Sequence, residues 1–317
     1  MKYNLCVENE SGTIKKCIKK ILAINNFLKE NKYDIVHTNE SPLHALLFAI
    51  VAKKRGVKRI IVHAHTNNEA DSIKFSKIFN SLIRELIPLF ATDLVAITPH
   101  AARWYYPKRY CKSGKVKMIK NGIDTDKFIF NQDIRNKTRE KLDLNDKFVI
   151  GHVGRLSFQK NQEFLIEIFK EILKINEKAF LLMVGEGENL DVLRKKISEA
   201  NLDKYVMFYG VSDNVEALMQ AMDVFVMPSR FEGLGIVAIE AQAAGLITVC
   251  SKQVPQETCL SPIIKYIDLE DGAKVWAKEI LELTEKYERK DMSQYIINND
   301  YDIKNSAKKL EKLYLYK

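Results

Sequence analysis

The stretch from Val224 to Gly245, VFVMPSRFEGLGIVAIEAQAAG, constrains most strongly what this chain can fold into. An apolar run ends at Pro228, glycines follow at Gly233 and Gly235, and a helical pattern then continues. A short apolar run bounded by turn residues indicates a buried strand, and the glycines indicate a tight turn before the helix. The order predicts a strand–turn–helix unit of an α/β domain. The backbone N–H groups at the start of its helix would suit a phosphate.

Two glutamates belong to this unit, Glu232 before the helix and Glu240 inside it. A carboxylate accepts hydrogen bonds from sugar hydroxyls, as the acidic residue of a dinucleotide-binding fold does with ribose. One short segment could therefore hold both a diphosphate and a ribose. From these residues alone, an ordinary β–α unit with solvated glutamates is the alternative.

Strands and helices alternate along the rest of the chain. The expected strands are residues 33–38, 59–62, 93–97, 115–119, 148–154, 179–184, 205–209, 223–227, 246–250 and 263–267. This alternation predicts parallel sheets in doubly wound domains, with ligands at the carboxyl ends of the strands. His65 follows one such end. His63 points the same way as His65 on an extended strand, but no third ligand is near in the sequence, so no metal site is expected.

The length and the charge distribution predict two domains. A chain of 317 residues exceeds the size at which single cores usually split. Residues 1–130 hold 23 Lys and Arg against 11 Asp and Glu, whereas residues 131–317 hold 27 against 30. Asn121-Gly122 is a strong turn signal, and the charge balance changes near Asn131. The basic first half suits an anionic membrane surface or a phosphate-bearing acceptor, with solvated lysines as the alternative; no nucleic-acid motif accompanies it.

Composition indicates the cytoplasm. No apolar run is long enough to span a membrane, and the first residues do not form a secretory signal. The five cysteines form no C-x-x-C pair, which favours reduced thiols and argues against a zinc site. Peripheral contact with the inner face of the cell membrane stays open, because residues 12–32 form a basic amphipathic helical pattern.

The segment Ser229 to Gly235, with seven residues between Glu232 and Glu240, resembles the signature of retaining glycosyltransferases of family 4. Members have the GT-B fold, in which two Rossmann-like doubly wound α/β domains face a cleft. In that family the first glutamate faces the donor sugar and the second binds the nucleotide ribose. The resemblance implies these roles for Glu232 and Glu240.

Two other segments resemble elements of the same family. G-R-L-x-x-x-K-N from Gly154 to Asn161 is similar to its diphosphate-binding element, and His-Ala-His-Thr from His63 places His65 near the donor sugar and reaction centre. The resemblance therefore implies catalytic roles for His65 and Glu232. It also implies a nucleotide-sugar site formed by Gly154, Arg155, Lys160, Gly233, Leu234, Gly235 and Glu240.

The resemblance divides the chain into three parts. These are an acceptor-side domain (residues 1–130), a nucleotide-sugar-binding domain (residues 131–300) and a C-terminal helix (residues 301–317) that crosses back to the first domain. Family members begin with a strand, a glycine-rich loop and further units before the helix that here starts near Gly12. We expect this opening to be absent and the N-terminal domain to be incomplete. A truncated inactive enzyme, a divergent active one and a subunit completed by a partner chain all stay open.

The implied activity is that of a retaining, hexosyltransferase-type enzyme. It would move a sugar from a nucleotide-diphosphate sugar, expected to be UDP-linked, to a polysaccharide or lipid-linked acceptor in capsule or exopolysaccharide synthesis. No metal or other cofactor is expected, since cations and the helix start would neutralise the leaving diphosphate. The alternative is an inactive glycosyltransferase-like subunit that binds nucleotide or a partner enzyme. A sugar-nucleotide epimerase would need acid and base catalysts that the sequence does not offer.

Overall fold

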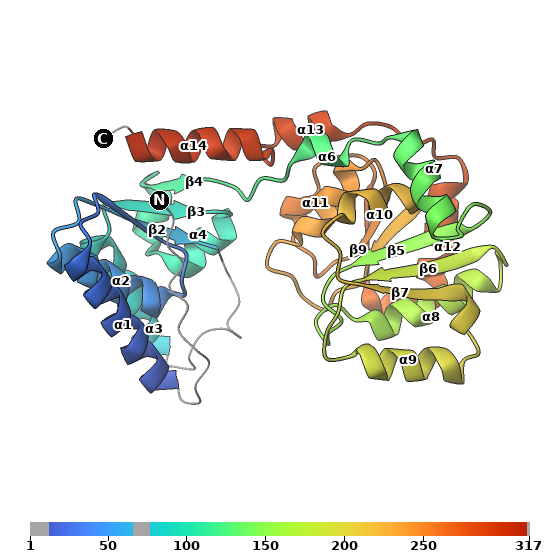
Figure 1. Cartoon of the computed structure of the whole chain (residues 1–317), viewed down its shortest axis with the longest axis horizontal. Helices are drawn as coiled ribbons and strands as arrows, with labels where there is room; N and C mark the ends of the chain where they lie inside the picture. Colours follow the sequence, from blue (N-terminus) through green and yellow to red (C-terminus); the bar gives the residue numbers. More distant parts are fainter. Residues whose placement is uncertain (1–12, 66–76, 316–317) are drawn as a thin grey trace. The chain divides into compact units, whose positions relative to one another are not determined.

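The structure is a computed structural model that describes residues 13–65 and 77–315 (Figure 1). The expected loss of an N-terminal strand concerns residues 1–12, which lie outside the described residues. Contacts divide the chain into two compact units. Unit 1 comprises Met1–Asn121 and Ser306–Lys317, and unit 2 comprises Gly122–Asn305. Each unit is described by itself.

Unit 1 contains a four-stranded parallel sheet in the order β1-β2-β3-β4. Its strands are β1 (Ile35–Thr38), β2 (Arg59–Ala64), β3 (Asp93–Ala96) and β4 (Val116–Met118). Its helices are α1 (Thr13–Glu30), α2 (Pro42–Lys54), α3 (Lys77–Phe90), α4 (Pro99–Tyr105) and α5 (Lys108–Lys112), with most of α14 (Ile303–Leu315). No helix of the described residues is long and apolar enough to cross a membrane.

The two faces of this sheet pack against different helices, because successive side chains of a strand point to opposite faces. Ile60 and Val62 of β2 join a large core with residues of α2, α3 and α4. Ile61, between them, belongs to a small cluster that includes Leu313 of α14. The C-terminal helix therefore covers the second face of the first sheet.

Unit 2 contains a six-stranded parallel sheet in the order β10-β9-β8-β5-β6-β7. Its strands are β5 (Phe148–Val153), β6 (Ala179–Val184), β7 (Val206–Gly210), β8 (Val224–Met227), β9 (Ile247–Ser251) and β10 (Ile264–Ile267). Its helices are α6 (Thr125–Phe128), α7 (Gln132–Lys141), α8 (Gln162–Leu173), α9 (Leu190–Glu199), α10 (Val215–Ala221), α11 (Ile236–Ala243), α12 (Gly272–Glu285) and α13 (Ser293–Asn298).

Helices cover both faces of the second sheet, as in a doubly wound domain. Val224 and Val226 of β8 pack with residues of α8, α9 and α12. Phe225 and Met227 point the other way and pack with residues of α10 and α11. Figure 1 shows α8 and α9 on one side of the sheet and α10 and α11 on the other. The prediction of parallel sheets in two α/β units is confirmed.

The units divide at the Asn121-Gly122 turn rather than near Asn131. The segment that follows the turn belongs to unit 2, because Ile123 and Phe128 are buried in a core of that unit. Ile123 also forms a parallel bridge with Asp302. The change in charge balance near residue 131 therefore comes after the structural boundary, and the functional roles assigned to the parts remain predictions.

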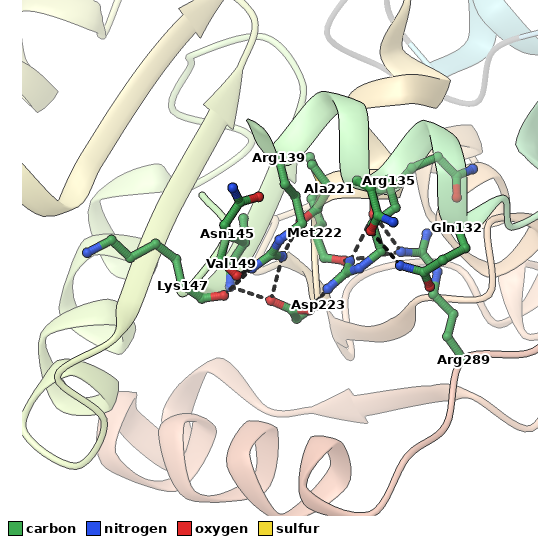
Figure 2. Close-up of polar contacts among 12 residues, drawn as sticks. Gln132, Arg135, Arg139, Asn145, Lys147, Val149, Ala221, Met222, Asp223 and Arg289 are labelled. Carbon is green, nitrogen blue, oxygen red and sulfur yellow. Dashed lines mark hydrogen bonds and ion pairs between the residues drawn. The ribbon is translucent and has the colours of Figure 1, made fainter. Parts of the chain in front are cut away.

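One aspartate at the amino-terminal edge of the second sheet interacts with two arginines of α7 (Figure 2). Asp223 forms ion pairs with Arg135 and Arg139, and its carboxylate accepts a hydrogen bond from Val149 N of β5 at 2.7 Å. Arg289, from the segment after α12, joins these arginines in donating to carbonyls at the end of α10. The acceptors are the carbonyls of Met219, Gln220, Ala221 and Met222. Cations thus satisfy the negative end of α10.

We expect Asp223→Asn to lower the free energy of unfolding by about 2 to 4 kcal/mol, because it leaves buried guanidinium groups without their carboxylate. Chemical denaturation measures this change. Glu167→Gln is the control, since it removes an exposed pair with Lys170 at 3.0 Å and should cost less than about 0.5 kcal/mol. An equally small effect of both substitutions would contradict the structural role of Asp223.

Candidate functional site

The strand order of unit 2 places two loops together. From β5 the chain continues to β6 and β7 on one side, and β8 to β10 lie on the other side. The loops that follow β5 and β8 therefore leave the carboxyl edge of the sheet next to each other. In open α/β sheets this reversal point is where ligands bind. Most of the residues expected at the nucleotide-sugar site lie in these two loops.

The ion pair between Lys160 and Glu232 joins the two loops. Lys160 Nζ lies 2.7 Å from Glu232 Oε1, and the glutamate side chain is only 6% exposed. The hydroxyl of Ser229 donates to Glu232 Oε1 at 2.7 Å, and the amide of Gln159 donates to Oε2 at 3.3 Å. Each carboxylate oxygen thus has a donor. The structure brings these two predicted site residues into direct contact.

Glycine at position 185 is required by the close approach of a third loop. Gly185 follows β6, and its φ is +128°. A Cβ atom there would lie 2.2 Å from the carbonyl oxygen of Gly154. Gly154 itself lies against Lys160, since a Cβ at Gly154 would be 3.2 Å from Lys160 Cε. Glycine at these two positions therefore lets the loops after β5 and β6 approach closely and leaves room for the Lys160 side chain beside Gly154.

Arg155 lies on the same loop as Lys160 but at its surface. Its Nε is 3.2 Å from Glu188 Oε2, and its side chain is 75% exposed. An exposed pair of this kind contributes little to stability. The guanidinium can therefore leave Glu188 for a ligand at small cost.

Helix α11 begins directly after the glycine turn. Gly235 is its N-cap, with φ +80° and ψ +48°, a left-handed conformation that favours glycine. Gly233 and Leu234 precede it in the loop after β8. The helix starts at Ile236, so its first backbone N–H groups lie at the glycine turn, where the sequence predicts a phosphate-binding site.

Glu240 lies inside α11 and differs sharply from Glu232. Among the described residues, its carboxylate makes no hydrogen bond and no ion pair. Burial, and the charge of Glu216 in the first turn of α10, raise the pKa of Glu240 from 4.5 to about 7. A half-buried carboxylate with free acceptor oxygens can accept hydrogen bonds from a pair of hydroxyls, such as those of a ribose.

His65 belongs to unit 1 and follows β2, as expected. Its ring lies 4.1 Å from that of His63, and its Nε2 is buried without a hydrogen-bond partner in the described part of the chain. Burial lowers the pKa of His65, which favours the neutral ring. The described residues hold no group of three metal-ligating side chains.

Two neighbours of His65 form a chain of hydrogen bonds that the sequence did not predict. His63 Nε2 lies 3.3 Å from the carbonyl oxygen of Ile119, so this nitrogen carries the proton. Burial lowers the pKa of His63 to about 3, so Nδ1 accepts, from His37 Nε2 at 3.2 Å. His37 Nδ1 then accepts from the hydroxyl of Tyr314 at 2.6 Å. The Ile119 carbonyl can only accept, so it fixes the direction of these hydrogen bonds as far as Tyr314 of α14.

Sequence reasoning missed Ser229 and Gln159 as partners of Glu232, and His37 and Tyr314 near His65. Ser229 and Gln159 lie within or next to the segments that the sequence singles out. They become neighbours of Glu232 only because β5 and β8 are adjacent in the sheet. The roles expected for the site residues are not tested by their positions and remain predictions.

Two models of glycosyltransferase families match this chain. Residues 134–302 match the family model described as "Glycosyl transferases group 1", and residues 12–127 match "Glycosyltransferase Family 4". One relative is the UDP-Gal:alpha-D-GlcNAc-diphosphoundecaprenol alpha-1,3-galactosyltransferase of Escherichia coli, 31% identical over 74% of this chain and 62% of its own length. Another is the capsular polysaccharide biosynthesis glycosyltransferase CapM of Staphylococcus aureus, 30% identical over 73% of this chain and 60% of its own length. The chain thus spans less than two thirds of both relatives.

A solved structure with a similar fold is that of Anabaena Alr3699/HepE in complex with UDP. It has a TM-score of 0.74 and 19% sequence identity, and the match covers 95% of this chain and 82% of that one. The likeness identifies the fold as GT-B, as the sequence predicts.

Glu240→Gln should stabilise the protein without ligand. The folded-state pKa of about 7 lies above 4.5, so between these pH values the folded state holds a proton that the unfolded state has released. The free energy of unfolding therefore falls as the pH rises through this window. At about pH 8 we expect the variant to be more stable than the wild type by about 1 to 3 kcal/mol.

Denaturation curves across this pH range measure the difference between the two proteins. It should vanish near pH 4, where the glutamate is protonated in both states. A variant that is less stable than the wild type at high pH would show that Glu240 has a stabilising partner instead.

Proposed function

The chain belongs to the group 1 glycosyl transferases, and from this premise we propose that it is a retaining enzyme that transfers a sugar from a nucleotide-diphosphate sugar to a glycan or lipid-linked acceptor. The observation that carries the proposal is the Lys160–Glu232 contact, at 2.7 Å, at the reversal point of the second sheet. The N-cap of α11 lies close to this contact, since a Cβ at Gly235 would be 3.7 Å from Glu232 Cγ, and the same helix carries Glu240.

Each group of the candidate site has a part in the proposed reaction. Lys160, Arg155 and the N–H groups after Gly233 neutralise the leaving diphosphate, a preorganised electrostatic role. Glu240 accepts hydrogen bonds from the ribose hydroxyls. Glu232, held by several donors, presents its carboxylate edge to hydroxyls of the donor sugar. No metal or further cofactor forms part of the proposal.

The proposed transfer keeps the configuration of the sugar. The bond between the anomeric carbon and the phosphate oxygen breaks, and a bond from that carbon to the acceptor oxygen forms on the same face. The proton of the acceptor hydroxyl passes to the leaving diphosphate, so no nucleophile of the protein is required. His65 of unit 1, whose lowered pKa favours the neutral ring, keeps its proposed catalytic role as a hydrogen-bonding group.

The relatives support a choice of substrate class. The E. coli relative is named for UDP-Gal and a diphosphoundecaprenol-linked acceptor, and CapM for capsular polysaccharide biosynthesis. The HepE structure contains UDP. We therefore favour a UDP-linked hexose as donor and a lipid-linked or polysaccharide acceptor in capsule or exopolysaccharide synthesis.

Purified protein incubated with a panel of UDP-, GDP- and dTDP-sugars, with and without a lipid-linked acceptor, tests the proposal. We expect nucleotide release that depends on acceptor. Lys160→Ala and Glu240→Ala should each weaken nucleotide binding by about tenfold or more, because each removes a charged hydrogen-bonding group. Lys170→Ala, an exposed lysine of α8, should bind like the wild type.

The outcomes separate the candidate functions. Unchanged nucleotide affinity in both site variants would refute the site. Nucleotide binding without any release, across the panel, would favour the inactive glycosyltransferase-like subunit over the enzyme.

Unit 1 also carries a surface that fits a membrane. Ile78, Leu82 and Leu89 of α3 are 83%, 54% and 58% exposed. At 3.6 residues per turn they lie within about 40° of one another around the helix axis. Together with the basic balance of residues 1–130, this apolar stripe supports peripheral contact with anionic lipid at the inner face of the cell membrane.

Leu82→Glu should reduce binding to vesicles that contain anionic lipid by about threefold or more, since it places a negative charge in the stripe. Co-sedimentation with anionic and with neutral vesicles measures the effect. Val192→Glu is the matched control, because Val192 is 49% exposed on α9 of unit 2. Equal binding of both variants and the wild type would contradict membrane contact through α3.

A further inference from the structure

Consecutive residues of the loop after β5 contact the loop after β8. Arg230 N donates to the carbonyl oxygen of Gln159 at 2.7 Å, and the Gln159 side-chain amide donates to the carbonyl of Phe231 at 3.0 Å. Asn161 Nδ2 donates to the carbonyl of Pro228 at 3.1 Å. These bonds, together with the ion pair described above, fix the backbone of Arg230 next to the candidate diphosphate site.

The cations of the candidate diphosphate site differ in their partners. Lys160 is neutralised by Glu232 at 2.7 Å, and Arg155 faces Glu188 at 3.2 Å. Arg230 has no ion pair among the described residues, and its side chain makes no hydrogen bond there; its Nε is buried without a partner. Arg230 therefore contributes the uncompensated positive charge of the two loops.

The guanidinium group of Arg230 stacks on an aromatic ring. The Cζ of Arg230 lies 4.3 Å from the centroid of Phe158, a residue of the loop after β5 that is 66% exposed. A guanidinium is weakly hydrated and stacks on an aromatic face, which orients its plane while the N–H groups at its edge stay available. The stack thus accounts for the exposed position of Phe158, a large apolar side chain in the same loop as Lys160.

We propose that Arg230 is a third cationic contact for the diphosphate of the donor and that Phe158 positions it, a role that rests on the proposed function. The planar fork of a guanidinium matches two phosphate oxygens. An incoming diphosphate must compete with Glu232 for Lys160, whereas it meets no carboxylate at Arg230. Arg230 is therefore the cation of the two loops that a diphosphate can bind without breaking an ion pair.

Calorimetric titrations of the full chain with UDP, GDP, inorganic pyrophosphate and uridine test this role. Arg230→Gln should weaken UDP and pyrophosphate binding by about tenfold and lower the salt dependence of both, since a charged contact is lost. Uridine carries no phosphate, so its binding should not change.

The Arg230→Lys variant should bind UDP and pyrophosphate more tightly than Arg230→Gln, and Phe158→Leu should give an intermediate loss of affinity. Arg194→Gln is the matched control, because Arg194 is stacked on Phe208 at 5.9 Å, away from the two loops.

The results separate this inference from the proposed function. If the wild type binds nucleotide and Arg230→Gln binds it equally well, the role of Arg230 is overturned while the function stands. Equal losses for UDP and uridine would show a structural role instead and also overturn it. If pyrophosphate binds and depends on Arg230 but no nucleotide binds, the anion contact stands and the proposed function falls. If the wild type binds neither, both fall.

Discussion

The ion pair between Lys160 and Glu232 is the contact on which the rest of the site depends. It joins the loops that follow β5 and β8, and it exists because these strands are neighbours in the sheet although β6 and β7 separate them in sequence. With both charges largely buried, each would be costly without the other. The pair thus keeps a cation and a carboxylate at the carboxyl edge of the sheet, beside the start of α11, before any ligand arrives.

Helix α10 lies between Glu240 and the arginine cluster around Asp223 in unit 2. Its last carbonyls are held by the three arginines around Asp223, and its first turn carries Glu216, which helps to raise the pKa of Glu240. The charges at the amino-terminal edge of the sheet are therefore compensated, whereas Glu240, in the helix that begins at the carboxyl edge, has no ion pair among the described residues. Binding sites often retain such unfavourable charges, because a ligand supplies the missing partners.

Much of this arrangement could be predicted from the sequence, because it follows local chemistry. The apolar run, the glycine turn and the helix from Val224 to Gly245 are read directly from residue type. The side chains that contact this segment could not be predicted, because these contacts depend on which strands pair. Gln159 contacts Glu232 only because β5 lies beside β8. The bond from His37 to Tyr314 joins the first strand to the last helix, and no local pattern indicates it. The division at Asn121-Gly122 follows the burial of Ile123 and Phe128 in a core of unit 2, which the charge balance of the sequence does not indicate.

The most direct measurement of the central claim is a crystal structure of the chain with a UDP-sugar. The account predicts that the diphosphate lies within hydrogen-bond distance of Lys160 Nζ and the first N–H groups of α11, with the ribose hydroxyls on Glu240. A nucleotide bound elsewhere, with the Lys160–Glu232 pair untouched, would contradict it.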